Sequence, residues 1–72
     1  MRASNDPAGL TDDELATNER HHQTFGDTYQ RLAAKDDNAE RAKAYRDLAA
    51  RHQSAADACR KEIKRRKRGG AA

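Results

Sequence analysis

The sequence predicts an all-α fold: an antiparallel hairpin of two helices, over about residues 12–35 and 38–67, in one small domain. Apolar side chains recur at intervals of three and four residues in each segment, which is the spacing of one helix face. Each segment also begins with a capping signal of the kind that starts helices. The ends, 1–9 and 69–72, carry glycine or proline and little apolar bulk, so we expect flexible tails there.

The first helix is expected to begin within the sequence LTDDEL, residues 10–15. Thr11 has the side chain of a good N-cap, and Glu14, three residues later, completes a capping box by bonding back to the cap backbone. Leu15 then opens an apolar stripe with the spacing of one helix face. The stripe comprises Leu15, His22, Phe25, Tyr29 and Leu32.

The second helix follows the sequence DDNAE, residues 36–40, in which Asp37 is expected to cap the helix and Glu40 to reach back to it. Its apolar stripe comprises Tyr45, Leu48, His52, Ala56, Cys59 and Ile63. In one continuous helix the two stripes would point apart, because Tyr29 and Tyr45 would lie about 160° apart around the axis. A hairpin that turns at residues 36–38 instead brings the stripes face to face.

The register of this hairpin pairs large residues mostly with small ones, as an interdigitating core requires. Tyr29 is expected opposite Tyr45, and His22 opposite His52. Gly26, which costs a helix interior about 1 kcal/mol relative to alanine, is expected to make room for Leu48. The remaining expected pairs are Leu32 with Ala42, Phe25 with Ala49, Asn18 with Ala56, and Leu15 with Cys59.

The chain has few side chains that can fill a core. It has 72 residues and no tryptophan, and a chain of this size buries too little surface to be comfortably stable alone. We therefore expect two hairpins to pair into a homodimeric four-helix bundle or, alternatively, a protein partner to cover the apolar stripe. The residues expected at this interface are Leu15, Phe25, Tyr29, Leu32, Tyr45, Leu48, Cys59 and Ile63.

Charge is divided unevenly along the chain, whose net charge is +3. Residues 1–38 contain four basic and eight acidic side chains, and residues 39–72 contain eleven basic and four acidic ones, which gives −4 and +7. The second helix is expected to extend about five residues past the first, so that the cations at 64–68 have only Asp6 near them. The cations of the whole basic region are Arg60, Lys61, Lys64, Arg65, Arg66, Lys67 and Arg68.

Such a patch attracts nucleic-acid phosphates by counterion release, independently of base sequence. No aromatic residue is interleaved with the cations, and no helix-turn-helix, zinc-finger or ribonucleoprotein motif is present, so neither base stacking nor base readout is expected. The sequence therefore predicts a small regulatory or accessory protein that binds DNA or RNA phosphates. The alternatives are a protein-binding adaptor or inhibitor, and a solvated helix end whose cations only complement the helix dipole.

Two histidines, His22 and His52, are expected to form a polar layer that fixes the register, or alternatively a proton switch. Glu19 and His22 have the Glu-x-x-His spacing of di-iron bundles, but the facing helix offers His52 and no carboxylate, so no metal is expected. No nucleophile is combined with a base and an orienting acid, and no glycine-rich loop opens a helix. Neither an enzymatic activity nor a cofactor is therefore expected.

The sequence also indicates where the protein resides. Cys59 is the single cysteine, so the chain cannot form an internal disulfide, and the N-terminal region lacks the apolar core of a signal peptide. No apolar run reaches the length of a membrane span, so no membrane association is expected. We therefore expect a cytoplasmic protein.

Overall fold

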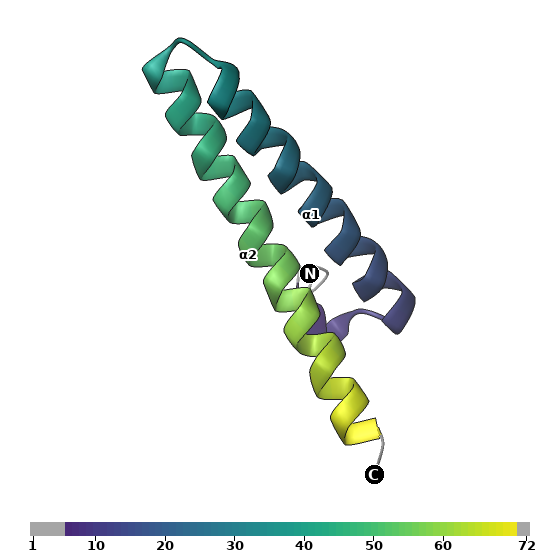
Figure 1. Cartoon of the computed structure of the whole chain (residues 1–72). Helices are drawn as coiled ribbons and strands as arrows, with labels where there is room; N and C mark the ends of the chain where they lie inside the picture. The colour runs from purple at the N-terminus through teal and green to yellow at the C-terminus, as the bar shows by residue number, and fades with distance from the viewer. Residues whose placement is uncertain (1–5, 71–72) are drawn as a thin grey trace.

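A computed structural model of the chain describes residues 6–70. Over this range the backbone forms a short 3-10 helix η2, Pro7–Gly9, followed by the helices α1, Asp12–Lys35, and α2, Ala39–Gly70, and it contains no strand. The helices α1 and α2 lie side by side and antiparallel, joined at one end by a tight turn (Figure 1). The predicted all-α hairpin is confirmed.

α1 begins and ends at the residues that the sequence predicts. The capping box at its start is complete: the Glu14 amide donates to Thr11 Oγ1 at 3.1 Å, and the Thr11 amide donates to Glu14 Oε1 at 2.8 Å. Both amides would otherwise lack an intrahelical acceptor at the helix start. Asp12 and Asp13 stand in the first turn, where the helix dipole favours anions.

The turn between the helices is capped differently from the prediction. Asn38, not Asp37, caps α2: its side-chain oxygen accepts from the Arg41 amide at 2.9 Å, and its carbonyl accepts from the Ala42 amide at 2.9 Å. Asp36 accepts from the Asn38 amide at 2.8 Å and also holds the Arg41 guanidinium. The hydrogen bond from Arg41 lowers the pKa of Asp36, which keeps this carboxylate charged at the end of α1.

The ends of the chain also depart from expectation. α2 continues past the predicted end at residue 67, so that Gly69 and Gly70 are helical where a flexible tail was expected. At the other end, η2 gives regular structure to part of the predicted tail 1–9. The remaining tail residues, 1–5 and 71–72, lie outside the described part of the chain.

Small side chains fill the seam between α1 and α2. The buried positions are Leu15, Gly26, Ala33, Ala42, Ala49, Ala56 and Cys59. Among residues 6–70, Leu15 is the one large side chain that is fully buried. Phe25 is 49% exposed and Leu32 is 39% exposed, while Tyr29, Tyr45, Leu48 and Ile63 are half-buried. The interior of one hairpin is therefore made mostly of alanine, and much of its larger apolar surface faces outward.

The register agrees with the prediction in its aromatic layers. The rings of Tyr29 and Tyr45 stack with their centroids 5.9 Å apart, and those of His22 and His52 lie 5.2 Å apart. Gly26, however, does not face Leu48. A Cβ atom at Gly26 would lie 3.1 Å from Gln53 Cγ and 3.6 Å from the Ala49 carbonyl oxygen, so this glycine lets α2 approach at Ala49 and Gln53.

The N-terminal segment, residues 6–11, crosses the hairpin at its open end, where α1 begins and α2 runs on (Figure 1). The Asp6 side chain starts η2 by accepting a hydrogen bond from the Ala8 amide at 3.1 Å. Pro7 and Leu10 then lie against both helices. They line a cavity of about 110 Å³ together with Asn18, His22, Ala55, Ala58 and Cys59. The segment thus covers part of the hairpin at its open end.

Candidate nucleic-acid interface

The seven predicted phosphate-binding cations lie on the last turns of α2, which extends beyond the start of α1 (Figure 1). We call this set the basic end: Arg60, Lys61, Lys64, Arg65, Arg66, Lys67 and Arg68. The structure divides these residues into side chains that hold the fold together and side chains that remain open to solvent.

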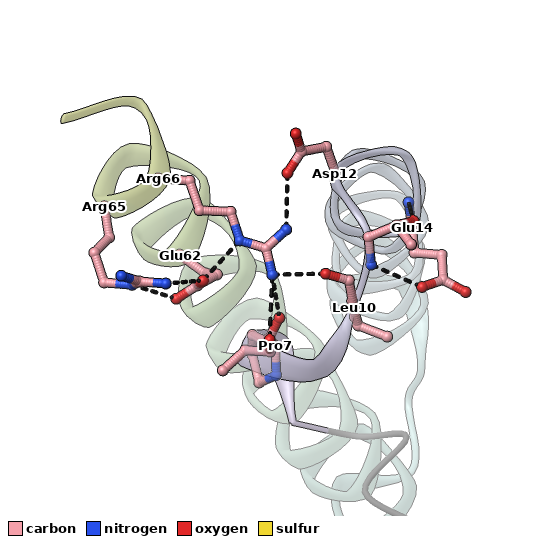
Figure 2. Close-up of polar contacts among 9 residues, drawn as sticks. Pro7, Leu10, Asp12, Glu14, Glu62, Arg65 and Arg66 are labelled. Carbon is pink, nitrogen blue, oxygen red and sulfur yellow. Dashed lines mark hydrogen bonds and ion pairs between the residues drawn. The ribbon is translucent and has the colours of Figure 1, made fainter. Parts of the chain in front are cut away.

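Arg66 belongs to the fold. Its guanidinium donates to Asp12 Oδ1 and Glu62 Oε2, each at 2.8 Å, and to the backbone carbonyls of Pro7, Ala8 and Leu10 at 3.4, 3.3 and 2.6 Å (Figure 2). Only a quarter of its side chain is exposed. The expectation that Arg66 lacks acidic neighbours is therefore wrong, because the N-terminal segment and the first residue of α1 both reach it.

Arg65 also has a partner, but it stays accessible. Its guanidinium makes two hydrogen bonds to the Glu62 carboxylate, at 2.9 and 2.6 Å (Figure 2). The hydrogen bonds from Arg65 and then Arg66 lower the pKa of Glu62 to about 2, so this carboxylate is ionised across the physiological range. Because the Arg65 side chain is 68% exposed, its pairing with Glu62 still leaves it open to a further anion.

Arg60 and Lys61 are paired with acids other than those predicted. Arg60 donates to Glu19 across the helix seam at 3.0 Å, to the Gln23 side chain at 3.2 Å, and lies 3.7 Å from Asp57 on its own helix. Lys61 lies 3.4 Å from Asp57. The predicted register, in which Leu15 faces Cys59, places Asp12, Asp13 and Glu14 opposite residues 60–62, whereas in the structure Asp12 meets Arg66 further along α2.

Lys64, Lys67 and Arg68 form no ion pair with any residue in the described range 6–70, and all three are exposed. Lys67 also borders a groove of about 410 Å³ between the helices at the open end. The groove is lined by Asp12, Ala16, Ile63, Arg66 and Lys67. These three cations are the part of the basic end that the fold leaves without an internal role.

The spacing of the exposed cations places most of them on one side of α2. Lys61, Lys64, Arg65 and Arg68 follow an i, i+3, i+4, i+7 pattern, which forms one stripe along a helix. We call these four residues the outer basic stripe. At about 100° per residue, the stripe points away from Cys59 and Ile63, which face α1. The packing of α2 against α1 therefore leaves the outer basic stripe open to solvent.

The two predicted polar-layer histidines meet across the seam. His22 Nδ1 and His52 Nδ1 are 3.0 Å apart, and both residues are half-buried. The His52 ring also packs against Phe25, with centroids 5.2 Å apart, and stacks on Tyr29 at 5.7 Å. Burial first, then the proximity of His52 and His21, lowers the pKa of His22, which favours its neutral form near pH 7.

Cys59 is a buried free thiol on the same side of the hairpin. Burial, with a smaller effect of the nearby Glu19 carboxylate, raises the pKa of this thiol. Because the thiolate is the reactive form of cysteine, Cys59 behaves as a small apolar residue in the seam. Over residues 6–70, no three His, Cys, Asp or Glu side chains are placed to share a metal ion.

The structural role of Arg66 was missed by sequence reasoning, although its spacing of three and seven residues from Ile63 and Cys59 places it on the side of α2 that faces α1. The guanidinium depends on carbonyls from η2, whose path across the hairpin no stripe predicts. The apolar interface set is also divided by the structure: Leu15 and Cys59 are buried inside the hairpin, while Phe25 and Leu32 point outward.

No protein-family model matches this chain, and the searches of curated proteins and of solved structures give no significant match. Within residues 6–70, neither long helix contains an apolar stretch that meets the requirements of a membrane span.

Proposed function

We propose that this chain is a small non-enzymatic accessory or regulatory protein whose outer basic stripe, together with the neighbouring Lys67, binds the phosphates of DNA or RNA without reading base sequence. The observation that carries the proposal is the set of cations that the fold leaves free. Lys64, Lys67 and Arg68 have no acidic partner among residues 6–70.

Arg65 and Lys61 add to this surface. The ion pair of Lys61 with Asp57 is solvent-exposed on both sides, and such pairs are worth at most about 1 kcal/mol. Arg65 is held more firmly by its two hydrogen bonds to Glu62, but 68% of its side chain is exposed. A phosphate can therefore reach both side chains from the solvent without displacing their acidic partners. Arg60 and Arg66 are excluded from the proposed grip, because they hold the two helices and the N-terminal segment together.

A second copy of the hairpin is the other part of the proposal. His22 lines the cavity beneath Pro7 and Leu10, and its neighbour His52 packs on Phe25 and Tyr29. The apolar surface therefore continues from the part of the hairpin that the N-terminal segment covers toward the turn at residues 36–38, where no described segment covers it. Phe25 and Leu32 lie there about half exposed, at 49% and 39%.

We place a second copy on this uncovered surface to form an antiparallel four-helix bundle. The described structure is one helix layer thick, at 14 Å, and a second layer would bury the exposed aromatic and leucine side chains. Overlap near the two turns leaves both N-terminal segments in place. It also keeps the two basic ends at opposite ends of the assembly, whereas a parallel arrangement would bring like charges together.

Fluorescence anisotropy of labelled duplex DNA and structured RNA at about 50 and 200 mM salt tests the phosphate grip. The triple variant Lys64→Ala, Lys67→Ala, Arg68→Ala is compared with a charge-matched control, Lys43→Ala, Arg46→Ala, Arg51→Ala, on the same helix. We expect the first variant to weaken binding and reduce the logarithmic salt slope for duplex DNA by about 3, at about 0.9 per phosphate contact. Equal effects of the two variants, or no binding by the wild type at low salt, would refute the proposal.

Sedimentation equilibrium tests the second copy. The wild type is expected to be a dimer at micromolar concentration, and the double variant Phe25→Ala, Leu32→Ala a monomer with unchanged helical circular dichroism. A monomeric wild type would contradict the dimer. The exposed Phe25 and Leu32 would then favour the second candidate function, an adaptor or inhibitor whose apolar face is covered by another protein.

A further inference from the structure

We propose that His22 and His52 form a two-imidazole site for a divalent transition metal of the zinc or copper type. The site lies on the helix seam, away from the outer basic stripe, and it depends on neither phosphate binding nor the second copy. The distance between the two Nδ1 atoms, 3.0 Å, carries the proposal.

That distance is close to what a shared metal ion requires. Zinc binds imidazole nitrogen at about 2.0–2.1 Å, so two nitrogens on one ion are roughly 2.9 Å apart at a right angle and roughly 3.3 Å apart at the tetrahedral angle. The observed 3.0 Å falls inside this interval. To bind one ion, the two rings have to turn so that both Nδ1 lone pairs converge on it and no longer point along the line between the two nitrogens.

The surroundings hold the pair in place. The His52 ring is stacked on Tyr29 with 13° between the planes, and it packs against Phe25 at 5.2 Å. Backbone of two helices carries the two ligands, so their separation is set by the seam and not by a loop.

The other candidate ligands nearby are already committed. Glu19, whose spacing to His22 resembles a di-iron motif, is held by Arg60 at 3.0 Å. Cys59 is a buried free thiol in the lining of the same cavity as His22, but it is not placed with the two histidines to share an ion. In the range 6–70 no third ligand joins the pair, so water fills the remaining positions on the ion. Such an open site favours exchangeable binding over a permanent structural metal.

Zinc titration of the full chain tests the site, with circular dichroism at fixed protein concentration as the readout. Zinc at about ten times its dissociation constant is expected to raise the melting temperature by roughly 5 °C or more, reversibly with chelator. His22→Gln and His52→Gln are expected to abolish the shift. His21→Ala is the matched control, because it removes the adjacent histidine, and Cys59→Ser tests the thiol; both variants are expected to keep the shift.

Imidazole nitrogen NMR of the wild type gives an answer that needs no variant to fold. Zinc is expected to shift the Nδ1 resonances of two histidines and to leave the third unchanged. Either of two results overturns the proposal: no response of the wild type to zinc, or a response that persists in both glutamine variants. The 3.0 Å contact would then be only a hydrogen bond between neutral rings.

Discussion

Arg66 joins the two ends of the described chain, with its Nη1 atom 2.8 Å from Asp12 Oδ1 across 54 residues of sequence. The same guanidinium bonds three carbonyls of the N-terminal segment. A planar guanidinium with five donors suits this task, because one side chain can serve carboxylates and carbonyls at once.

We therefore predict that Arg66→Ala lowers the melting temperature more than Arg65→Ala, although each variant removes one charge from the same turn. Arg65 bonds only Glu62 in the described structure, whereas Arg66 holds residues from three elements. Arg66→Lys is expected to resemble Arg66→Ala, since an ammonium group cannot reproduce the planar, multiply donating geometry of the guanidinium. Thermal unfolding and amide exchange at residues 8–10 measure the effect. Equal melting temperatures for the Arg65 and Arg66 variants would contradict the prediction.

Leu15 is the position where loss of side-chain volume is expected to matter most. It is fully buried against the alanine-rich seam, and truncation of a buried leucine to alanine costs about 2–5 kcal/mol. In a hairpin this small, that loss is expected to unfold most of the population. Thr24→Ala, at an exposed position of α1 outside the proposed dimer interface, serves as the control in urea titrations. It is expected to leave helix content intact at concentrations where the Leu15 variant loses it.

Gly26→Ala is predicted to stabilise the hairpin by up to about 1 kcal/mol, the helix-propensity gain of alanine over glycine. The closest atom to the new methyl group is Gln53 Cγ at 3.1 Å, and the Gln53 side chain is exposed and free to rotate. Gly26→Leu is expected to destabilise by about 1–3 kcal/mol through overpacking against Ala49. A destabilising Gly26→Ala would contradict the prediction. If the added change Gln53→Ala then removes the destabilisation, the cause is a Gln53 side chain that does not move away from the new methyl group.

Stability is expected to fall as the pH drops below about 6.5. The pKa of His22 is lowered in the folded state, so the unfolded chain binds a proton at this residue more readily than the folded chain does. The contribution of neutral His22 to stability is therefore full above pH 6.5 and is lost as the pH falls toward the pKa of the folded state. The groups that face His22 are His52 on α2 and Cys59 across the small cavity, and His21 adjoins it in the chain. Melting temperatures between pH 8 and 5 measure the effect.

The control for this prediction is His22→Gln, which keeps a polar side chain but cannot titrate. Its melting temperature is expected to change less between pH 8 and 5 than that of the wild type. Glu62 does not contribute in this window, because its pKa is about 2 and its stabilising charge is lost only as the pH falls toward that value. Identical pH profiles of the wild type and the His22 variant would contradict the assignment to His22.

The elements that local rules govern were predictable from the sequence. The capping box at Thr11 and the apolar stripes placed α1 at its observed bounds, and helix periodicity put Tyr29 opposite Tyr45 and His22 opposite His52. These features depend on residues three, four or seven positions apart, where helix geometry leaves few choices.

The candidate site was less predictable because it depends on long side chains and an irregular segment. The spacing of the cations puts Arg66 on the side of Cys59 and Ile63 and Arg68 on the opposite side. It does not predict that Arg66 is held by five partners while Arg68 forms no ion pair within residues 6–70. At the turn, Asp37 and Asn38 are both good caps. The choice of Asn38 follows from the bond that Asp36 makes to its amide.

The continuation of α2 to Gly70 changes how its last charges meet a partner. A cationic tail without structure has to lose conformational entropy when it settles on a ligand, and that loss weakens the complex. Lys67 and Arg68 instead lie in a preformed helix, in which each residue advances about 1.5 Å along the axis. The distance between their positions along the axis is therefore fixed, and a polyanion with a matching spacing of charges can bind without any loss of conformational entropy in this part of the backbone.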